Sequence, residues 1–377
     1  MPHSTTLLNR RGFLAASTAA LAPLHAAPKA AVESIVTISK HPEFYHGWPT
    51  LARRANGDLL VVCSGGRESH VCPFGRVELM RSHDDGRTWS WPEVLMDTAI
   101  DDRDAGVCET PKGSLLVTTF TSLAYEAPLA KAANWDAERL AKWQAVNRRV
   151  GEAERKSLLG TWMLRSTDGG LNWSAPYRVP LNSPHGPVAL ADGRILYAGK
   201  KLWDPGGKVG VADSSDDGKT WRWLSDIPVR SGDSGENYHE LHAIQAKNGT
   251  ILVQIRNHNK LNQGETLQCE STDGGKSWTL PHPIGVWGLP SQLLRLRDGR
   301  LLMSYGYRRV PFGNQARLSE DNGKTWSEAM TISDDGATGD LGYPSSVELA
   351  GGGLLTLWYE LPKGGKHAEL RLARWKI

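Results

Sequence analysis

The sequence predicts an all-β protein, a six-bladed β-propeller that carries one helical insertion in its second blade. Two repeated motifs support this fold class. A box of the form S-x-D-x-G-x-x-W occurs five times, and a glycine turn followed by x-[LI]-L occurs six times. Repetition of short units at intervals of this size indicates an array of similar structural elements. Short strands alternating with tight turns favour four-stranded blades arranged around an axis.

The five boxes are predicted to be turns that stabilise the fold. They read "SHDDGRTW" (82–89), "STDGGLNW" (166–173), "SSDDGKTW" (214–221), "STDGGKSW" (271–278) and "SEDNGKTW" (319–326). The adjacent Asp84 and Asp85 of the first box look like paired catalytic carboxylates, but an active site needs one such pair, whereas a repeated element needs many copies. In each box the aspartate can accept hydrogen bonds from turn amides while the tryptophan covers the hairpin.

The six glycine turns set the number of blades. They are "NGDLL" (56–60), "KGSLL" (112–116), "DGRIL" (192–196), "NGTIL" (248–252), "DGRLL" (298–302) and "GGGLL" (351–355). Glycine permits the positive φ of a tight hairpin, and each turn marks the junction of strands 1 and 2. The sixth hairpin has no box after it, but "AELRLARWKI" supplies its third strand, and "ESIVTIS" (33–39) is free to add the outer strand that closes the ring.

The interval between the second and third turns contains a predicted helical insertion at 126–159. Leu140, Trp143 and Val150 recur there at helical spacing, and Asp136 and Glu138 are suited to a helix start. The insertion belongs to a loop between strands 2 and 3, at the rim away from the boxes. We expect it to form a wall or lid over a pocket. The alternative is a surface decoration.

Residues 1–27 resemble an export signal, with the twin arginine Arg10 and Arg11, an apolar run and small residues near Ala26. The remaining 28–377 would form the propeller in the periplasm or outside the cell. No later stretch is long and apolar enough for a membrane span. The net charge of +3 includes no basic stripe, which argues against a nucleic-acid partner.

Four cysteines are too few for a disulfide scaffold, and their spacings match no zinc pattern. Cys63 and Cys72 are expected to be isolated buried thiols, and a bridge between them is the alternative. The sequence suggests neither a metal nor a cofactor.

Strand direction predicts where a ligand pocket lies. Residues just before strand 1 and just after strand 2 of each blade meet at the rim opposite the boxes. The candidates on this rim include His46, Trp48, Arg67, Glu68, His70, Arg103, Asp104, His185, His239, Glu240, His242, Arg256, His258, Arg308, Arg309 and Tyr343. Several arginines facing one cavity suit a carboxylate ligand, because the guanidinium fork matches a carboxylate with two hydrogen bonds.

Two segments resemble the sialidase (neuraminidase) superfamily, and the boxes extend the resemblance over essentially the whole chain after residue 27. "NYHELHAIQAKNGTILVQIR" is similar to the segment in which a glutamate precedes a hairpin and an arginine ends the next strand. "GYPSSVELAGGGLLTLWYE" resembles the closing blade, which carries a nucleophilic tyrosine. The resemblance implies Tyr343 as nucleophile, Glu240 as its base and Arg256 as a ligand of the substrate carboxylate. A phenol is protonated at neutral pH, so it needs such a base.

The sequence departs from that family at three positions. "GWP" (47–49) stands where the first of three family arginines is expected, and Gln315 stands where the third is expected. "GGRESH" (65–70) replaces the acid/base aspartate, which leaves Glu68 or His70 as proton donor. Arg67, Arg103 or Arg308 would assist Arg256. The sequence therefore predicts a divergent branch.

The function that follows is an exported exo-glycosidase that removes a terminal acidic sugar from a glycan. Asp104, His46, Trp48 and His239 are further candidate substrate-binding residues. One alternative is a polysaccharide lyase acting on uronic acids, with a metal on His239 or His242, although an extended segment would point these two apart. Another is a non-catalytic carbohydrate-binding propeller, with aromatic stacking by Trp48, Trp203, Trp287 and Tyr307.

Overall fold

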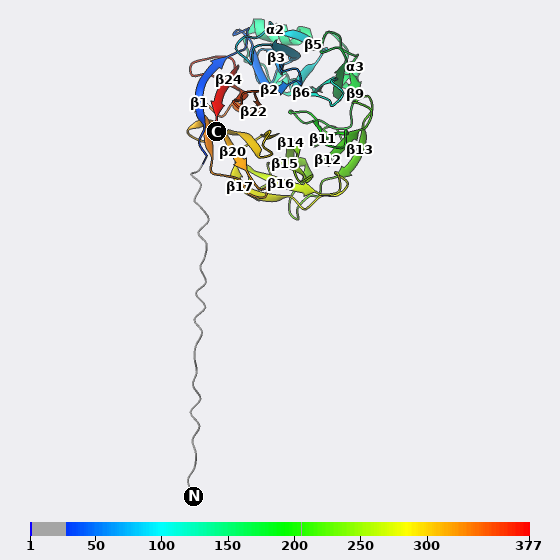
Figure 1. Cartoon of the computed structure of the whole chain (residues 1–377). Coiled ribbons are helices and arrows are strands. Elements are labelled where there is room, and N and C mark those ends of the chain that lie inside the picture. Colours follow the sequence, from blue (N-terminus) through cyan, green and yellow to red (C-terminus); the bar gives the residue numbers. More distant parts are fainter. Residues whose placement is uncertain (2–27, 205) are drawn as a thin grey trace.

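The computed structural model describes residue 1 and residues 28–204 and 206–377, so the expected export signal at 1–27 lies almost wholly outside the described residues. The chain forms six four-stranded antiparallel sheets around a central axis (Figure 1). The predicted six-bladed propeller is confirmed.

The blades follow one another along the chain, and their strands are numbered here from the axis outward. Blade 1 consists of β2 (Tyr45–Arg53), β3 (Leu59–Arg67), β4 (Arg76–Ser82) and β5 (Glu93–Met96). Blade 2 consists of β6 (Asp101–Glu109), β7 (Leu115–Ser122), β8 (Thr161–Ser166) and β9 (Tyr177–Arg178). Blade 3 consists of β10 (Val188–Ala189), β11 (Ile195–Lys200), β12 (Val209–Ser214) and β13 (Arg222–Asp226). Blade 4 consists of β14 (Tyr238–Gln245), β15 (Ile251–Asn257), β16 (Glu265–Ser271) and β17 (His282–Trp287). Blade 5 consists of β18 (Ser291–Arg295), β19 (Leu301–Tyr307), β20 (Phe312–Ser319) and β21 (Met330–Gly336). A short 3-10 helix, η1 (Gly235–Asn237), precedes β14.

The sixth blade joins the two ends of the described chain. It consists of β22 (Leu341–Glu348), β23 (Leu354–Glu360), β24 (Glu369–Lys376) and β1 (Ala31–Thr37). β1 pairs antiparallel with β24, with Thr37 opposite Arg371. The predicted closure by an early strand is therefore confirmed, and it leaves no unpaired sheet edge on β24.

The hydrophobic core lies between neighbouring blades. Leu60 and Val77 of blade 1 pack with Val107 and Val117 of blade 2, and similar clusters fill each following interface. Each such side chain contributes roughly 1.5–3 kcal/mol when it is buried. Because both faces of the second strand of each blade are covered, these strands begin with a run of apolar residues, as in the LLVVC of β3, rather than alternating with polar residues.

The boxes are turns, as predicted. In the first box the Asp84 carboxylate accepts hydrogen bonds from the Thr88 amide at 2.9 Å and hydroxyl at 2.6 Å, and the Trp89 indole donates to the Gly86 carbonyl at 3.2 Å. The side-chain hydrogen bond from Thr88 is the main reason that the pKa of Asp84 falls to about 2. In the third box Asp217 accepts from Ser114, in the strand 1–2 hairpin of blade 2, which places the boxes on the rim of those hairpins.

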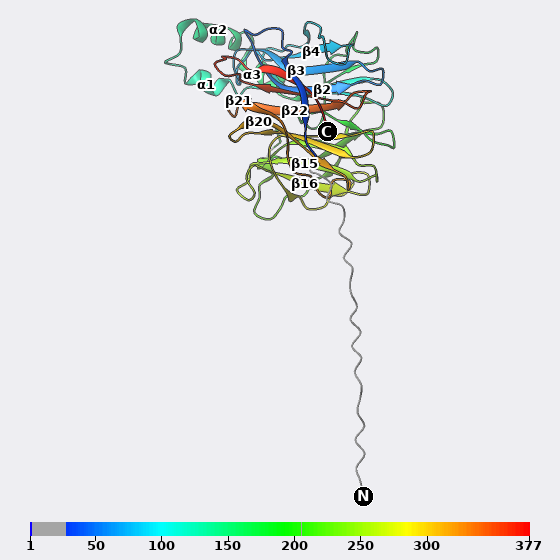
Figure 2. The same cartoon turned by 60° about the vertical axis from the view of Figure 1, so that its left-hand side comes forward.

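The predicted insertion at 126–159 is helical and lies between β7 and β8. It contains α1 (Glu126–Ala130), α2 (Ala137–Asn147) and α3 (Glu152–Leu158), which project from one rim (Figure 2). Asp136 caps α2 by accepting from the amides of Glu138 and Arg139 at 3.0 and 3.1 Å. Val150 falls between α2 and α3, so the helical repeat expected to include it is wrong at that position.

The four cysteines are free thiols in the structure. Cys63 is buried between blades 6 and 1, whereas Cys72 is buried beneath the insertion with Trp143. The described helices include none that is long and apolar enough to cross a membrane.

Candidate active site

Four blades share one distortion of the inner strand. Trp48, Asp104, Glu240 and Tyr343 have φ values of 49°, 46°, 42° and 54°, in the left-handed region that side chains other than glycine rarely adopt. Each lies at a break in the register between strands 1 and 2 of its blade. Such a conformation costs about 1–3 kcal/mol per residue and persists only where the surroundings hold it. Strained residues of this kind concentrate at functional sites.

Two of these residues meet across the axis. The Tyr343 hydroxyl of blade 6 donates a hydrogen bond to Oε1 of Glu240 in blade 4, although blade 5 separates them along the chain. Arg256 lies on β15 beside β14, and its Nη1 donates both to Glu240 Oε2 and to the Tyr343 hydroxyl, the latter at 3.1 Å. The three residues implied by the family resemblance therefore form one hydrogen-bonded group.

The pKa values of Glu240 and Tyr343 are shifted in opposite directions. Burial disfavours the Glu240 carboxylate, but the charge of Arg256 and the hydrogen bonds from Tyr343 and Arg256 outweigh it and lower the pKa of Glu240 to about 2. Burial, followed by the charge of Glu240, raises the pKa of Tyr343 well above 10. The resting pair is thus a neutral phenol against a carboxylate.

Only one of two neighbouring arginines faces the group. The Arg308 guanidinium lies 5.9 Å from the centre of the Tyr343 ring, and its Nε donates to the Leu341 carbonyl at 2.9 Å. Arg309 lies instead over the Trp287 ring, 3.7 Å from its centre. Gln315 accepts a hydrogen bond from Tyr305. Arg308 is therefore the second arginine beside Tyr343.

Arg67 has no free donor for a ligand. Its guanidinium makes two hydrogen bonds to Asp101, at 2.6 and 2.9 Å, and a third to Ser64 at 2.9 Å, and both charged side chains are fully buried. The structure thus places Arg67 in an internal ion pair.

Arg103 is placed differently. It lies over the Trp48 ring at 4.3 Å, with only a 3.5 Å approach to Asp101, and its Nε has no hydrogen-bond partner among the described residues. In "GWP" (47–49) Gly47 stands where the first family arginine is expected and Trp48 follows it, so an aromatic platform holds Arg103 next to the position of the missing charge.

Asp104 is a buried carboxyl group whose side chain has an unused oxygen. The residue is 7% exposed, and Oδ1 has no hydrogen-bond partner among the described residues. Burial raises the pKa of Asp104 to about 7, Arg103 opposes the rise and Glu240 adds to it. A carboxyl group with this pKa can give up or take a proton near neutral pH.

The two sequence candidates for proton donor have different surroundings. Glu68 is held by the insertion, because its carboxylate accepts from the Trp143 indole at 3.0 Å and pairs with Arg139 and Lys142 of α2. His70 is half-exposed, and its Nδ1 lies 3.0 Å from the Tyr45 hydroxyl and 3.1 Å from Asp340.

His70 also contacts Trp48, edge to face at 4.9 Å. Tyr45 and Asp340 lie in the segments expected to form the pocket, but no feature of the sequence distinguished them. Their equal spacing, with Tyr45 three residues before Trp48 and Asp340 three residues before Tyr343, was the available signal.

The remaining histidine candidates diverge. His46 is buried 4.0 Å from Glu78 of the same blade. His239 packs on His258 with ring centres 4.8 Å apart, and burial lowers the pKa of His239 to about 4. His242 points elsewhere, with Nδ1 accepting from the Leu293 amide, as expected for two residues of an extended segment. The described residues contain no group of three or more histidine, cysteine, aspartate or glutamate side chains arranged for a metal ion.

Fold and boxes together define a sialidase-like β-propeller. A model of the BNR repeat-like domain matches residues 129–356, more than half of the chain. The chain belongs to this BNR repeat-like family, as a divergent member. A search of the curated proteins found no match.

Solved structures agree on the fold. A protein of unknown function from Dyadobacter fermentans has a TM-score of 0.77 at 22% identity, covering 93% of this chain and 100% of that chain. The NanB sialidase of Streptococcus pneumoniae has a TM-score of 0.65 at 15% identity, covering 94% and 71%. The leech intramolecular trans-sialidase, complexed with 2,7-anhydro-Neu5Ac, has a TM-score of 0.64 at 13% identity, covering 92% and 70%.

Proposed function

We propose that the protein is a glycoside hydrolase of sialidase type that removes a terminal acidic sugar from glycans. The observation that carries this proposal is the hydrogen-bonded group of Tyr343, Glu240 and Arg256. A tyrosine paired with a carboxylate suits attack on an anomeric carbon that itself bears a carboxylate, because a bare carboxylate nucleophile would be repelled. Sialidases with a tyrosine nucleophile are a recognised exception to two-carboxylate glycoside hydrolysis.

In the proposed reaction the Tyr343 oxygen attacks the anomeric carbon while its proton passes to Glu240. The bond from that carbon to the aglycone oxygen breaks, and a proton donor supplies the hydrogen of the departing hydroxyl. Water then displaces Tyr343 from the sugar and gives up a proton to the donor that the first step left deprotonated, while Glu240 returns its proton to the phenol. Arg256 holds Glu240 in its ionised form throughout the resting state.

We assign the proton donor to Asp104, with His70 as the second candidate. Asp104 has an unpartnered oxygen and a pKa of about 7, so a large fraction of the enzyme carries the proton at neutral pH. Asp104→Asn and His70→Gln separate the two assignments, because replacing the donor lowers turnover most for substrates with a poor leaving group. Glu68 fits this role less well, since three side chains of α2 already hold its carboxylate.

The substrate carboxylate would be bound by Arg256 and Arg308, with Arg103, which lies over the Trp48 ring, as a third donor. The guanidinium groups beside Tyr343 supply planar donors for a carboxylate. Of these three arginines only Arg256 stands at an arginine position of the family, and we therefore propose an acidic sugar related to sialic acid, of unspecified N-acyl group and linkage.

The experiment is a substrate comparison with a matched variant. The purified protein is assayed on sialosides of different linkage and on uronic-acid glycans, and products are analysed by NMR and by absorbance of unsaturated uronates. We expect release of a saturated acidic sugar, reduced at least about 10³-fold in Tyr343→Phe. Tyr305→Phe, which removes a phenol that binds Gln315, serves as control.

Two outcomes would reject the assignment. An unsaturated product would identify a lyase, and binding without turnover across the panel would identify a carbohydrate-binding propeller. Full turnover by Tyr343→Phe would reject the nucleophile even if a glycan were hydrolysed.

We also propose that the protein is exported through the twin arginine Arg10 and Arg11. Replacing both arginines by lysine should retain the full-length chain inside the cell, as measured by fractionation and immunoblotting. Unchanged export of that variant would rule out the twin-arginine route.

A further inference from the structure

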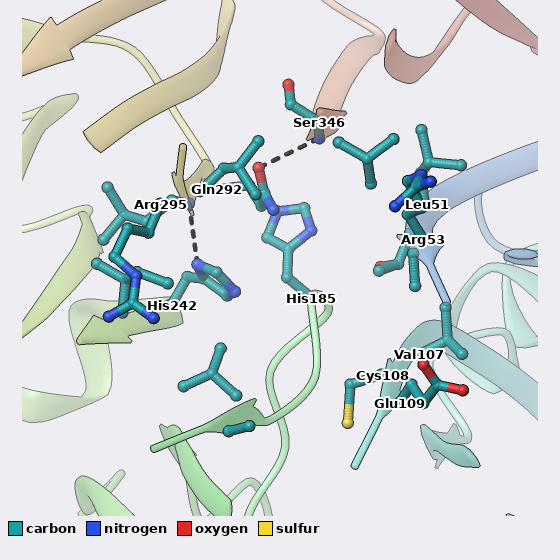
Figure 3. A pocket seen from close by; sticks show the side chains of 18 of the residues that line it. Leu51, Arg53, Val107, Cys108, Glu109, His185, His242, Gln292, Arg295 and Ser346 are labelled. Carbon is teal, nitrogen blue, oxygen red and sulfur yellow. Dashed lines mark hydrogen bonds between the residues drawn. The ribbon is translucent and has the colours of Figure 1, made fainter. Parts of the chain in front are cut away.

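A cavity lies on the propeller axis, at the rim of the boxes and beyond the strained residues. Its volume is about 390 Å³, and it is lined by the parts of the inner strands that follow Trp48, Asp104, Glu240 and Tyr343 in their blades (Figure 3). The side chains that matter below are Arg53, Arg295, His185, His242, Gln292 and Glu348. None of these residues takes part in the proposed hydrolysis.

The inner end of the cavity is formed by two imidazoles. His185 is 3% exposed, points into the cavity, and neither of its ring nitrogens has a hydrogen-bond partner among the described residues (Figure 3). His242 lies 5.5 Å away between ring centres, and its Nδ1 accepts from the Leu293 amide, so its Nε2 carries a hydrogen. Burial lowers the pKa of His185 to about 4, so this neutral ring also offers one N–H and one acceptor. Two unpartnered nitrogens at such a depth indicate a missing ligand or solvent.

Gln292 adds a donor to the same wall. Its Oε1 accepts from the Ser346 amide at 3.2 Å, which orients the side-chain amide and leaves its NH₂ group for the cavity (Figure 3).

The outer end of the cavity carries uncompensated positive charge. The Nε of Arg53 is buried without a hydrogen-bond partner among the described residues, and the ion pairs with nearby Asp58 and Glu109 are made by Arg54 instead. Arg295 belongs to blade 5, which blade 6 separates from blade 1, and it donates only to the Gln245 carbonyl at 3.1 Å. The carboxylates that line the cavity are already paired, because Glu109 accepts from Arg54 at 3.1 Å and Glu348 pairs with Arg297 at 3.3 Å.

We propose that this axial cavity binds a small oxyanion, a phosphate or a short carboxylic acid. Arg53 and Arg295 would neutralise its charge at the mouth, and the N–H groups of His185 and Gln292 would donate hydrogen bonds to its inner oxygens. Charged hydrogen bonds of this kind are about twice as strong as neutral ones. The site is distinct from the catalytic group, yet the two share a wall, since the His185 ring lies 6.4 Å from that of Tyr343.

Isothermal titration calorimetry of the full chain at pH 7 tests the proposal, with inorganic phosphate and malonate as separate probes. We expect one anion per chain, bound about tenfold more weakly by Arg53→Ala and by Arg295→Ala. Arg300→Ala removes an equal charge from a hairpin on the same rim that does not line the cavity, and should bind as the wild type does. Arg256→Gln, which keeps a donor toward Glu240, should also bind normally.

Each other outcome overturns the proposal. Absence of heat with both probes would show that the cavity holds only water, and equal weakening by Arg300→Ala would show an unspecific response to surface charge. Loss of binding in Arg256→Gln with retention in Arg53→Ala would place the anion at the catalytic group. Circular dichroism confirms that each variant is folded, and anomalous scattering from selenate soaked into crystals locates the anion relative to His185.

Discussion

The Tyr343 hydroxyl donates a hydrogen bond to Glu240, and both residues occupy the same left-handed position in the inner strand of their blades. The same local distortion of the backbone therefore occurs in blades 4 and 6, and it brings these two side chains together. Trp48 and Asp104 occupy that position in two other blades. The chain builds its candidate site by varying the side chain at a position whose backbone is already set.

Replacing Glu240 by glutamine should lower kcat by roughly 10²–10⁴-fold, because the phenol loses its proton acceptor. The fold should persist, since glutamine still accepts hydrogen bonds from Tyr343 and Arg256. Steady-state kinetics between pH 5 and 8 measure the loss. Glu240, with a pKa of about 2, should contribute no inflection to the wild-type profile in that range. Glu236→Gln, an exposed change four residues earlier, is the control, and equal activity of both variants would contradict the assigned base.

Asp104 should make the protein less stable as the pH rises. Its pKa is about 7 in the folded state and near 3.8 when exposed, so the folded state keeps a proton between about pH 4 and 7 that the unfolded state has released. Stability is therefore lost through that window. Asp104→Asn removes this dependence and should raise the free energy of unfolding at pH 8 by up to about 4 kcal/mol, with little change at pH 4.

Urea unfolding at both pH values provides the measurement. Asp85→Asn, in the turn of the first box, is the matched control because asparagine tolerates the same positive φ. A variant at Asp104 that follows the wild-type pH profile would show that this carboxyl is not buried in its neutral form.

Arg67→Met should destabilise the fold by about 3–5 kcal/mol, since it leaves Asp101 buried without its partner. The double variant Arg67→Met, Asp101→Leu should recover much of that loss, because it removes both charges. Thermal unfolding measures stability, and KM below the transition separates it from binding. Normal stability with a raised KM would assign Arg67 to the substrate after all.

Glu68→Gln should loosen the insertion, because the carboxylate joins the Trp143 indole, Arg139 and Lys142 to blade 1. We expect limited proteolysis within 126–159 to become several times faster. Trp91→Phe, at an exposed surface tryptophan, should leave it unchanged. Loss of turnover with unchanged protection of the insertion would instead favour Glu68 as the proton donor.

Much of the fold could be predicted because its signals are local and repeated. The five boxes and six glycine turns indicate the number of blades. Strand direction shows that these turns lie at the rim opposite the candidate site. The roles of individual arginines could not be predicted in this way. Arg67 and Arg308 both follow a second strand, and only the three-dimensional structure shows that Asp101 already binds Arg67.

The positions with a strained backbone also could not be predicted from the alternation of apolar and polar residues. Alternation along a strand assigns side chains to faces, but a break in register resets that assignment locally. The expectation that Glu240 and Tyr343 act together came from resemblance, and their contact emerges only when blades 4 and 6 are placed around the axis.

The pairing of β1 with β24 has a consequence for how the molecule is assembled. Blades 1 to 5 are built from neighbouring stretches of chain, so each can form from contacts of low sequence separation. Blade 6 must wait until the last strand meets one of the first, a contact of very high sequence separation that is expected to be slow to form. Because Tyr343 belongs to blade 6, the proposed nucleophile would reach its final position only in this last folding event.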